Sequence, residues 1–362
     1  METTAIKENV TPRYRVVPEL TREFSLLPEF ADADRVFLLT DSGVAQHYLP
    51  RTHTDALPAT VSMMTVPAGE ASKTLDTASK IWEWLTQEGA TRHSVLLNVG
   101  GGMVTDLGGF CAATFKRGMR FVNVSTTLLG AVDASIGGKT GVDFLNFKNQ
   151  VGVFAEPSVT YVPVDAFSTL PSGEFLSGYA EMLKTAFISS SALLARLYEL
   201  SPLSGAPLPL AEAIEECLKV KAAIVAADPT EKGLRKVLNF GHTAGHAYET
   251  LLLSRGTPVP HGVAVAHGLL PALILSHLHK GLDSMTVQTY ARFLARTYPP
   301  LPVSCSDRGE LLRLMAADKK NLGDGRISFT LLRAIGEPET DCLLTPAEVD
   351  EALDLRAELL GL

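Results

Sequence analysis

The sequence predicts an α/β N-terminal domain of the Rossmann-like type, followed by an all-α C-terminal domain. Before Leu170, short apolar runs alternate with helical segments, a pattern that implies parallel strands joined by right-handed crossovers. After that residue nearly every apolar segment has helical periodicity, and the intervening loops are rich in Pro, Gly and Ser. We therefore expect residues 1–174 to form the α/β domain and residues 175–362 to form the helical domain.

Five runs in the first half are predicted strands, because each is apolar and is followed by glycine or other turn residues. They are Arg35–Asp41, Val61–Val66, Ser94–Val99, Phe121–Val124 and Thr160–Val164. The segment Ser72–Glu88 has helical periodicity and ends at Gly89, so we expect a helix there.

The second half is predicted to contain five helices and one strand. The helices are Glu174–Ile188, Leu210–Ala227, His242–Leu253, Val263–His279 and Pro346–Leu360. The strand lies in GDGRISFTLL, where Asp324-Gly325 predicts a turn immediately before it.

The composition restricts the classes of partner. A chain of 362 residues with a formal net charge of -8 is a poor general binder of polyanions, so we expect no nucleic-acid partner. No uninterrupted apolar run reaches about 18 residues, which argues against a membrane span. The N-terminus METTAIKENVTPRYRV has no apolar stretch of the signal-peptide type, so a cytoplasmic location is expected. The four cysteines form no CxxC motif and are interpreted as reduced packing residues.

A glycine-rich turn in NVGGGMVTDLGGF is the first chemical feature. Gly100, Gly101 and Gly102 follow an apolar strand and open a helix, where the main chain can approach a bound phosphate and offer free N–H groups. The pattern is not GxGxxG, and a tight strand-to-helix turn without a ligand explains it equally well.

A polar stretch from Arg120 to Phe154 is the second feature. It carries Asp133, Lys139, Lys148 and Asn149 among glycines, with little apolar support. Lysines and an amide suit a phosphate or a polyol, so we interpret the stretch as a polar pocket wall. A solvated loop is the alternative.

A set of charged and imidazole side chains in the helical half is the third feature. Glu181 and Lys184 lie three residues apart on an otherwise apolar helix, where a buried charge needs a partner or a metal. His242 and His246 lie four residues apart, and His261 starts the next predicted helix. The residue after His242 is not the Glu that a zincin helix requires. Glu181, His242 and His261 together offer three ligands and an open position, as in catalytic zinc sites, although packing alone can also explain a histidine pair.

The motifs resemble those of the 3-dehydroquinate synthase family of sugar phosphate cyclases. The resemblance rests on motifs that occur in the same order: GGGMVTDLGGFCAATFKRG, STTLLGAVDASIGGKTGV, KNQVG, SGYAEMLK, EKGLRKVLNFGHTAGHAYE, PHGVAV and DKKNLGDGRISFTLL. It implies an NAD-binding first domain, a metal- and substrate-binding second domain and a homodimer. It also implies a sugar-acid phosphate substrate, 3-deoxy-D-arabino-heptulosonate 7-phosphate.

The resemblance further implies a role for individual residues. The metal, usually zinc with cobalt as a substitute, would be held by Glu181, His242 and His261. The phosphate would meet His246, Lys139, Asn149, Arg117 and one of Lys319 and Lys320. The reacting hydroxyls would meet Lys184, Asp133 and Asn239, and the carboxylate would meet Lys221 and Arg235. NAD would meet Asp41, Glu70, Lys73, Gly100, Gly101, Gly102, Asp106, Thr126, Thr127 and Lys148.

Three positions depart from the family pattern. Val263 stands where Glu is frequent, which leaves the partner of the His261 imidazole unassigned. Gly43 stands where an Asn often contacts the nicotinamide ribose, and Thr105 replaces a Gly. Three other interpretations stay open: a cyclase of sedoheptulose 7-phosphate, a metal- and NAD-dependent polyol dehydrogenase, and a binding module without catalysis.

Overall fold

The structure is a computed structural model that describes residues 13–20, 28–52, 61–134, 136–145, 147–200, 207–317 and 325–361. Its contacts divide the chain into two compact units. Unit 1 comprises Met1–Thr169 and Lys221–Thr230, and unit 2 comprises Leu170–Val220 and Glu231–Leu362. We predicted a boundary after residue 174 between two independently folding domains. Contacts within the structure do not test independent folding, so this boundary stays a prediction.

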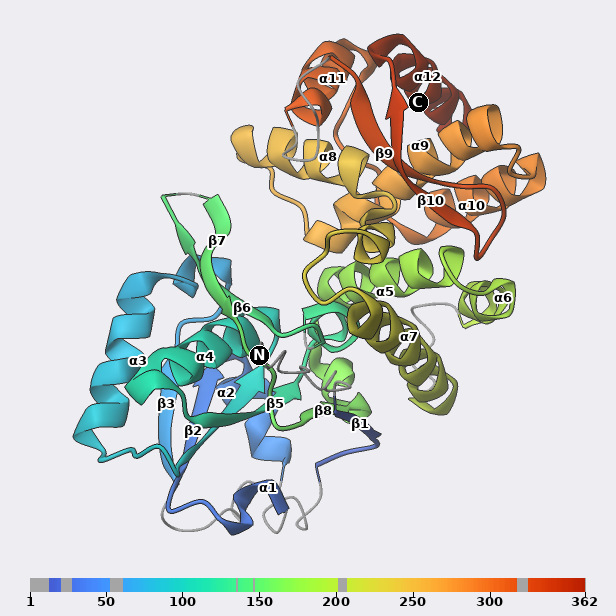
Figure 1. The fold of residues 1–362 in the computed structure, drawn as a ribbon. Coiled ribbons are helices and arrows are strands. Elements are labelled where there is room, and N and C mark those ends of the chain that lie inside the picture. Colours follow the sequence, from blue (N-terminus) through green and yellow to red (C-terminus); the bar gives the residue numbers. More distant parts are fainter. Residues whose placement is uncertain are drawn as a thin grey trace, which may run out of the picture. The chain divides into compact units, whose positions relative to one another are not determined.

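Unit 1 is built on a six-stranded parallel sheet with the strand order β1-β8-β5-β4-β2-β3 (Figure 1). The strands are β1 (Tyr14–Val17), β2 (Val36–Asp41), β3 (Ser62–Val66), β4 (Val95–Gly100), β5 (Arg120–Ser125) and β8 (Thr160–Pro163). The five predicted strands are therefore confirmed. The edge strand β1 was not predicted, because its four residues are too few to show a period.

Both faces of this sheet are covered. Phe37 and Leu39 of β2 belong to one hydrophobic core, and the alternate residues Val36 and Leu38 belong to another. The first core includes the helices α3 and α4, which lie side by side (Figure 1). The α-helices of unit 1 are α1 (Pro28–Ala31), α2 (Ser42–His47), α3 (Leu75–Gln87) and α4 (Gly102–Thr114), and its short helical turns are η2 (Leu49–Arg51), η4 (Glu70–Ser72), η5 (Phe115–Arg117), η6 (Gly130–Ala134) and η7 (Val164–Thr169). Apolar residues on both sides of each strand explain why the predicted strands read as continuous apolar runs.

The polar stretch that we interpreted as a pocket wall contains an antiparallel hairpin. Its strands are β6 (Lys139–Phe144) and β7 (Phe147–Phe154). Gly141 and Gly152 face each other across the pair, and Val142 lies in the same core as α4. Glycines and charged residues hide the two-residue period of a strand, which is why the sequence did not predict this hairpin.

Unit 2 is helical, as predicted, with one hairpin. Its elements are α5 (Ser172–Phe187), α6 (Ser191–Glu199), η8 (Leu234–Asn239), α8 (His242–Ser254), α9 (His261–Lys280), α10 (Ser284–Thr297), η9 (Cys305–Asp307), α11 (Arg308–Ala316), β9 (Ile327–Leu332), β10 (Pro338–Leu344) and α12 (Pro346–Leu360). Helix α7 (Pro207–Ala227) has residues in both units. The five predicted helices and the strand β9 are confirmed, whereas α6, α10, α11 and β10 were missed.

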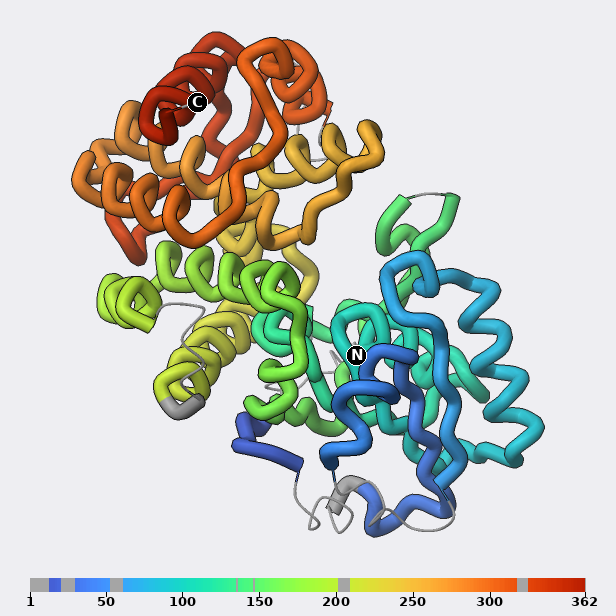
Figure 2. The backbone as a smooth tube through the Cα atoms, turned by 180° about the vertical axis from the view of Figure 1, so that it is seen from behind, coloured from blue at the N-terminus to red at the C-terminus, as the bar shows by residue number. Residues whose placement is uncertain are grey.

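Helix α9 is the core of unit 2. Every residue from Gly262 to Ser276 is buried, and α5, α8, α10, α12 and β9 all contact the helix (Figure 2). Among the described residues it is the one helix with the length and hydropathy of a membrane span, but 83% of its most apolar window is buried inside the protein. Its apolar surface is therefore covered by its neighbours in the fold.

Candidate active site

The carboxyl ends of β2, β4 and β5 meet at one edge of the sheet in unit 1. Strand β3 lies next to β2 on one side, whereas β5 lies next to β4 on the other side. The direction in which successive strands are added to the sheet therefore reverses between β2 and β4. Ligands of open α/β sheets bind outside the carboxyl ends of the strands at such a reversal. Asp41 ends β2, and Gly100 ends β4. Thr126 follows β5, and its main-chain N–H donates to the carbonyl oxygen of Gly100 at 2.9 Å. The predicted cofactor residues of three strands are thus brought together.

The glycine turn leaves room and donors at this edge. Helix α4 begins at Gly102, and the preceding Gly101 has no side chain that could cap the helix. A Cβ atom on Gly101 would lie 2.7 Å from the side chain of Thr127, so only glycine fits there. Ser125 Oγ and Thr126 Oγ1 are buried and find no hydrogen-bond partner in the described part of the chain. Free N–H groups and unsatisfied hydroxyls beside a narrow backbone turn fit the pyrophosphate of a dinucleotide.

The buried Lys73 joins three of the predicted residues in one cluster. Its Nζ atom lies 2.6 Å from Asp106 Oδ2, 2.5 Å from Asn149 Oδ1 and 3.6 Å from Glu70 Oε1. Burial raises the pKa of Asp106 to about 6, against the opposing effect of the Lys73 ammonium. Burial also disfavours the charge on Lys73, but Asp106 and Glu70 outweigh it and raise the pKa of this ammonium. Lys73 therefore stays charged in the cluster.

Asp41 serves as the N-cap of α2. Its Oδ1 atom accepts hydrogen bonds from the main-chain N–H groups of Gly43, at 2.8 Å, and Val44, at 3.0 Å. The cap fixes the direction of this carboxylate at the end of β2. A Cβ atom on Gly43 would lie 3.1 Å from the same oxygen, so the departure at this position leaves the Asp41 carboxylate uncrowded.

Asp133 and Lys221 form an ion pair within unit 1. Asp133 lies in the turn η6, and Lys221 donates to both its carboxylate and its main-chain oxygen. Lys221 is buried, so the pair is held in a fixed place. The structure thus joins a residue expected at the reacting hydroxyls to one expected at the carboxylate.

The predicted phosphate residues of unit 1 are less closely associated. Arg117 ends η5 with a φ of 68° and is exposed, and it forms no hydrogen bond or ion pair among the described residues. Lys139 starts β6, and Lys148 precedes Asn149 on β7, all of them exposed. Asn149 faces Lys73 rather than a set of phosphate-binding cations. Lys319 and Lys320 lie outside the described residues.

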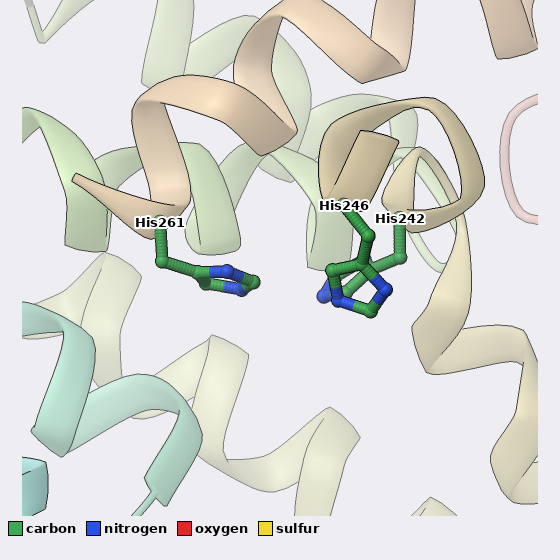
Figure 3. A group of neighbouring side chains, drawn as sticks. All are labelled: His242, His246 and His261. Carbon is green, nitrogen blue, oxygen red and sulfur yellow. The ribbon is translucent and has the colours of Figure 1, made fainter. Parts of the chain in front are cut away.

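Three imidazoles converge in unit 2. His242 and His246 lie on α8 and His261 lies at the start of α9, and the rings point toward one another (Figure 3). One nitrogen of each ring falls within 4.8 Å of those of the other two. The ring centroids of His242 and His261 are 5.5 Å apart. This spacing is short enough for one ion to be bound by two or three of the rings.

Glu181 of α5 completes the group. Its Oε1 atom lies 3.6 Å from Nε2 of His242 and 3.8 Å from Nε2 of His261. The residue is 1% exposed, and neither carboxylate oxygen has a hydrogen-bond partner in the described structure, although Lys184 forms an ion pair with Oε2. A buried carboxylate whose Oε1 atom has no hydrogen-bond partner among the described residues and faces two imidazole nitrogens fits a divalent cation such as zinc or cobalt. The structure thus brings the three predicted ligands together, and His246 is also within reach.

The position of His261 depends on close packing between α9 and α5. A Cβ atom on Gly262 would overlap the main-chain oxygen of Ser177, so glycine is required there. Its N–H donates to Ser177 Oγ at 2.8 Å. Because Ser177 lies one turn before Glu181, the contact holds His261 beside the carboxylate.

Two residues of this region escaped the sequence analysis. Glu231 has a φ of 59°, and its Oε1 atom accepts a hydrogen bond from Nδ2 of Asn239 at 3.1 Å. Arg235, on the intervening turn η8, is buried. Glu249 of α8 lies 2.9 Å from Nδ1 of His261. Both glutamates stand within EKGLRKVLNFGHTAGHAYE, but the partner of Glu231 depends on the fold of the loop and η8, and that of Glu249 on the packing of α8 against α9.

Comparisons with known proteins agree with the sequence motifs. The family models described as 3-dehydroquinate synthase N-terminal and C-terminal match residues 63–177 and 178–321. The 3-dehydroquinate synthase of Parabacteroides distasonis is 39% identical over 331 residues, with 91% of this chain and 93% of that protein covered. The 3-dehydroquinate synthase of Methylococcus capsulatus is 39% identical over 328 residues, with 90% and 89% covered.

A solved structure agrees with the fold. The 2-epi-5-epi-valiolone synthase of Streptomyces hygroscopicus, solved with NAD+ and Zn2+ bound, matches with a TM-score of 0.82, 25% identity and 99% coverage of both chains. The resemblance that the motifs predicted is confirmed by the family models and the relatives together. The chain belongs to the 3-dehydroquinate synthase family.

Proposed function

We propose that this chain converts 3-deoxy-D-arabino-heptulosonate 7-phosphate to 3-dehydroquinate and phosphate, a lyase reaction of the shikimate pathway. In this reaction the substrate is oxidised and re-reduced within one turnover, phosphate is eliminated between those steps, and an intramolecular aldol addition closes the ring. The observation that carries the proposal is the buried carboxylate of Glu181, whose Oε1 atom has no hydrogen-bond partner among the described residues and faces Nε2 of both His242 and His261.

Two groups would be bound. Glu181, His242 and His261 would hold zinc or cobalt. The dinucleotide would be held by residues at the sheet edge and in the Lys73 cluster: Asp41, Glu70, Lys73, Gly100, Gly101, Gly102, Asp106, Thr126, Thr127 and Lys148. When bound, the metal supplies a Lewis acid for the substrate hydroxyls and NAD supplies a hydride acceptor that is restored in each turnover.

The chain's own residues would orient the substrate. Lys184, Asp133 and Asn239 would contact the hydroxyls at the reacting carbons, where two of the three are already fixed by ion pairs with Glu181 and Lys221. His246, Lys139, Arg117, Asn149 and one of Lys319 and Lys320 would stabilise the charge on the departing phosphate. Arg235 and Lys221 would bind the substrate carboxylate.

The remaining expectations extend this proposal. We expect a cytoplasmic homodimer whose ligand is a small sugar-acid phosphate, with neither nucleic acid nor a membrane as a partner. These expectations rest on the family, on the net charge of -8 and on the burial of α9.

One assay separates this function from its rivals. Purified protein with the heptulosonate phosphate, NAD and Zn2+ should release phosphate while the absorbance of NADH stays low. Accumulation of one NADH for each substrate consumed would instead indicate a polyol dehydrogenase. Equal turnover of sedoheptulose 7-phosphate would indicate the sibling cyclase, and absence of turnover on either sugar would contradict the proposal.

A further inference from the structure

The imidazole of His261 has a carboxylate on the side opposite Glu181. Its Nδ1 atom lies 2.9 Å from Oε2 of Glu249, and its Nε2 atom lies 3.8 Å from Oε1 of Glu181. Glu249 stands on α8, three residues after His246, whereas His261 starts α9. The contact thus connects the two helices that carry the imidazoles.

A carboxylate at hydrogen-bond distance fixes the tautomer of a histidine. An ionised carboxylate only accepts, so the Nδ1 atom of His261 must carry the proton that is shared with Glu249. The lone pair of the neutral ring is then on Nε2, the nitrogen that faces Glu181. Metal-binding histidines are commonly oriented in this way by a second side chain.

We propose that Glu249 is a positioning residue for the metal site: it accepts the Nδ1 proton of His261 and thereby holds the Nε2 lone pair toward Glu181. The proposal rests on the metal-dependent function stated above. It also identifies a partner for the imidazole at the place where the sequence departs from its family. Val263 is apolar and 2% exposed, so it offers no acceptor, and the carboxylate comes from a different helix.

The comparison with His242 shows why a side chain matters at this position. Nδ1 of His242 lies 3.2 Å from the main-chain oxygen of Phe240, so its ring is oriented by the backbone. No substitution removes that oxygen. His242 would therefore keep its orienting partner in any variant. A substitution at Glu249 removes the orienting partner of His261.

A purely structural role is the alternative. Ion pairs near the surface contribute little to stability, and the side chains of His261 and Glu249 are only partly buried. Such a role predicts a lower melting temperature with unchanged metal binding. The positioning role predicts weaker metal binding with little change in the fold of the metal-free protein.

The test is to titrate metal-free wild type, Glu249→Gln and Glu249→Ala with Co2+, following the visible absorption of the bound ion, and with Zn2+ in competition. Outer partners of metal-binding histidines typically contribute 10- to 100-fold in affinity, so Glu249→Ala should weaken binding by about that factor and alter the Co2+ spectrum. Glu249→Gln should lose less metal affinity than Glu249→Ala. Its amide oxygen can still accept the Nδ1 proton of His261, although it lacks the charge of the carboxylate. Glu310→Gln, which changes a surface glutamate paired with Arg313, should bind like wild type.

The outcomes separate the two proposals. Wild-type affinity and spectrum in Glu249→Ala, together with loss of the ion in His261→Ala, would overturn the positioning role and leave the metal site intact. A wild-type protein that binds neither ion would overturn the metal site itself. If Glu249→Ala lowers the melting temperature of the metal-free protein, Glu249→Leu decides, because leucine fills a similar space without a hydrogen-bond acceptor: unchanged affinity and an unchanged spectrum there also contradict the proposal.

Discussion

Nζ of Lys73 lies 2.6 Å from Oδ2 of Asp106, although Lys73 follows the turn η4 and Asp106 lies on the helix α4. Lys73 is 3% exposed and the side chain of Asp106 is 18% exposed, so the pair is largely shielded from water. Lys73→Met should leave the carboxylate without its cation. Removing one partner of a buried pair costs about 3–5 kcal/mol, and the remaining exposure of Asp106 favours the lower value. Urea unfolding at pH 7.5 measures this loss, and a titration with NAD should show weaker binding.

Lys219 supplies the control for this experiment. It pairs with Glu215 at 3.0 Å on the surface of α7, where its side chain is 65% exposed. Lys219→Met should change the free energy of unfolding by less than about 0.5 kcal/mol. Equal stability of the two variants would show that the Lys73–Asp106 pair does not stabilise unit 1.

The same pair shows what the sequence could and could not predict. Glu70, Lys73 and Asp106 were predicted as one group from family motifs, and the structure places them together. The contact between Lys73 and Asn149 spans 76 residues and depends on the hairpin β6–β7. That hairpin was not predicted, because glycines and exposed aromatic residues obscure its alternation. Local periodicity identifies elements, but it does not determine which of them meet.

The proposed metal site also combines features that the sequence predicts with contacts that it does not. Glu181, His242 and His261 are recognisable by residue type and motif, and the helices that carry them were predicted from the sequence. The contact of Glu249 with His261 follows from how α8 packs against α9, which no spacing rule encodes. The helices α10 and α11, which the sequence did not predict, pack against α9 and α8, so part of the structure that supports these motifs was not predicted.

The two histidines of α8 should differ in function. His242 faces Glu181 through Nε2, whereas the proposed function places His246 at the phosphate. His242→Ala should lose its metal on dialysis, and His246→Ala should retain the metal but release phosphate more slowly. Metal analysis of both variants measures the difference. In wild type, a chelator should abolish activity, and added Zn2+ or Co2+ should restore it. Equal metal loss in both would mean that His246 is also a ligand, which its position within 4.8 Å allows.

His267 should make the protein sensitive to acid. Burial, followed by the nearby guanidinium of Arg356, lowers the pKa of this histidine to about 4. A histidine in the unfolded chain titrates near pH 6.5, so the unfolded state binds the proton first as the pH falls. The contribution to stability is therefore complete above pH 6.5 and is lost as the pH falls to about 4. The shift in the pKa of His267 corresponds to a loss of about 3 kcal/mol in the free energy of unfolding as the pH falls from 6.5 to about 4.

The measurement compares unfolding free energies at pH 7 and pH 4.5. In His267→Gln the amide can still donate to Pro299 O, which lies 2.9 Å from Nε2 of the histidine, and it cannot be protonated. The variant should lose less stability than wild type between the two values. His93→Gln, at an exposed position, should behave as wild type does. Parallel pH profiles for wild type and His267→Gln would rule out this histidine as the source of acid sensitivity.

Arg235 should decide which cyclic sugar the enzyme accepts. The heptulosonate carries a carboxylate that sedoheptulose 7-phosphate lacks, so selectivity needs a cation for that group. Lys221 already donates to Asp133, whereas a guanidinium can bind a carboxylate through two parallel N–H bonds. Arg235 is 4% exposed, which excludes the usual fate of an arginine on a solvated surface.

Arg235→Leu should therefore lower kcat/KM for the heptulosonate by about two to four orders of magnitude, because an unpaired, desolvated carboxylate costs about 3–5 kcal/mol. The effect on sedoheptulose 7-phosphate should be small, so the preference of wild type should largely disappear. Arg333→Leu removes an exposed arginine that pairs with Glu339 and should leave both values unchanged. If Arg235→Leu slows both sugars equally, Arg235 supports the fold of η8 or the metal site rather than the carboxylate. If wild type itself shows no preference, the substrate is not defined by its carboxylate, and the assignment of this chain to the heptulosonate must be given up.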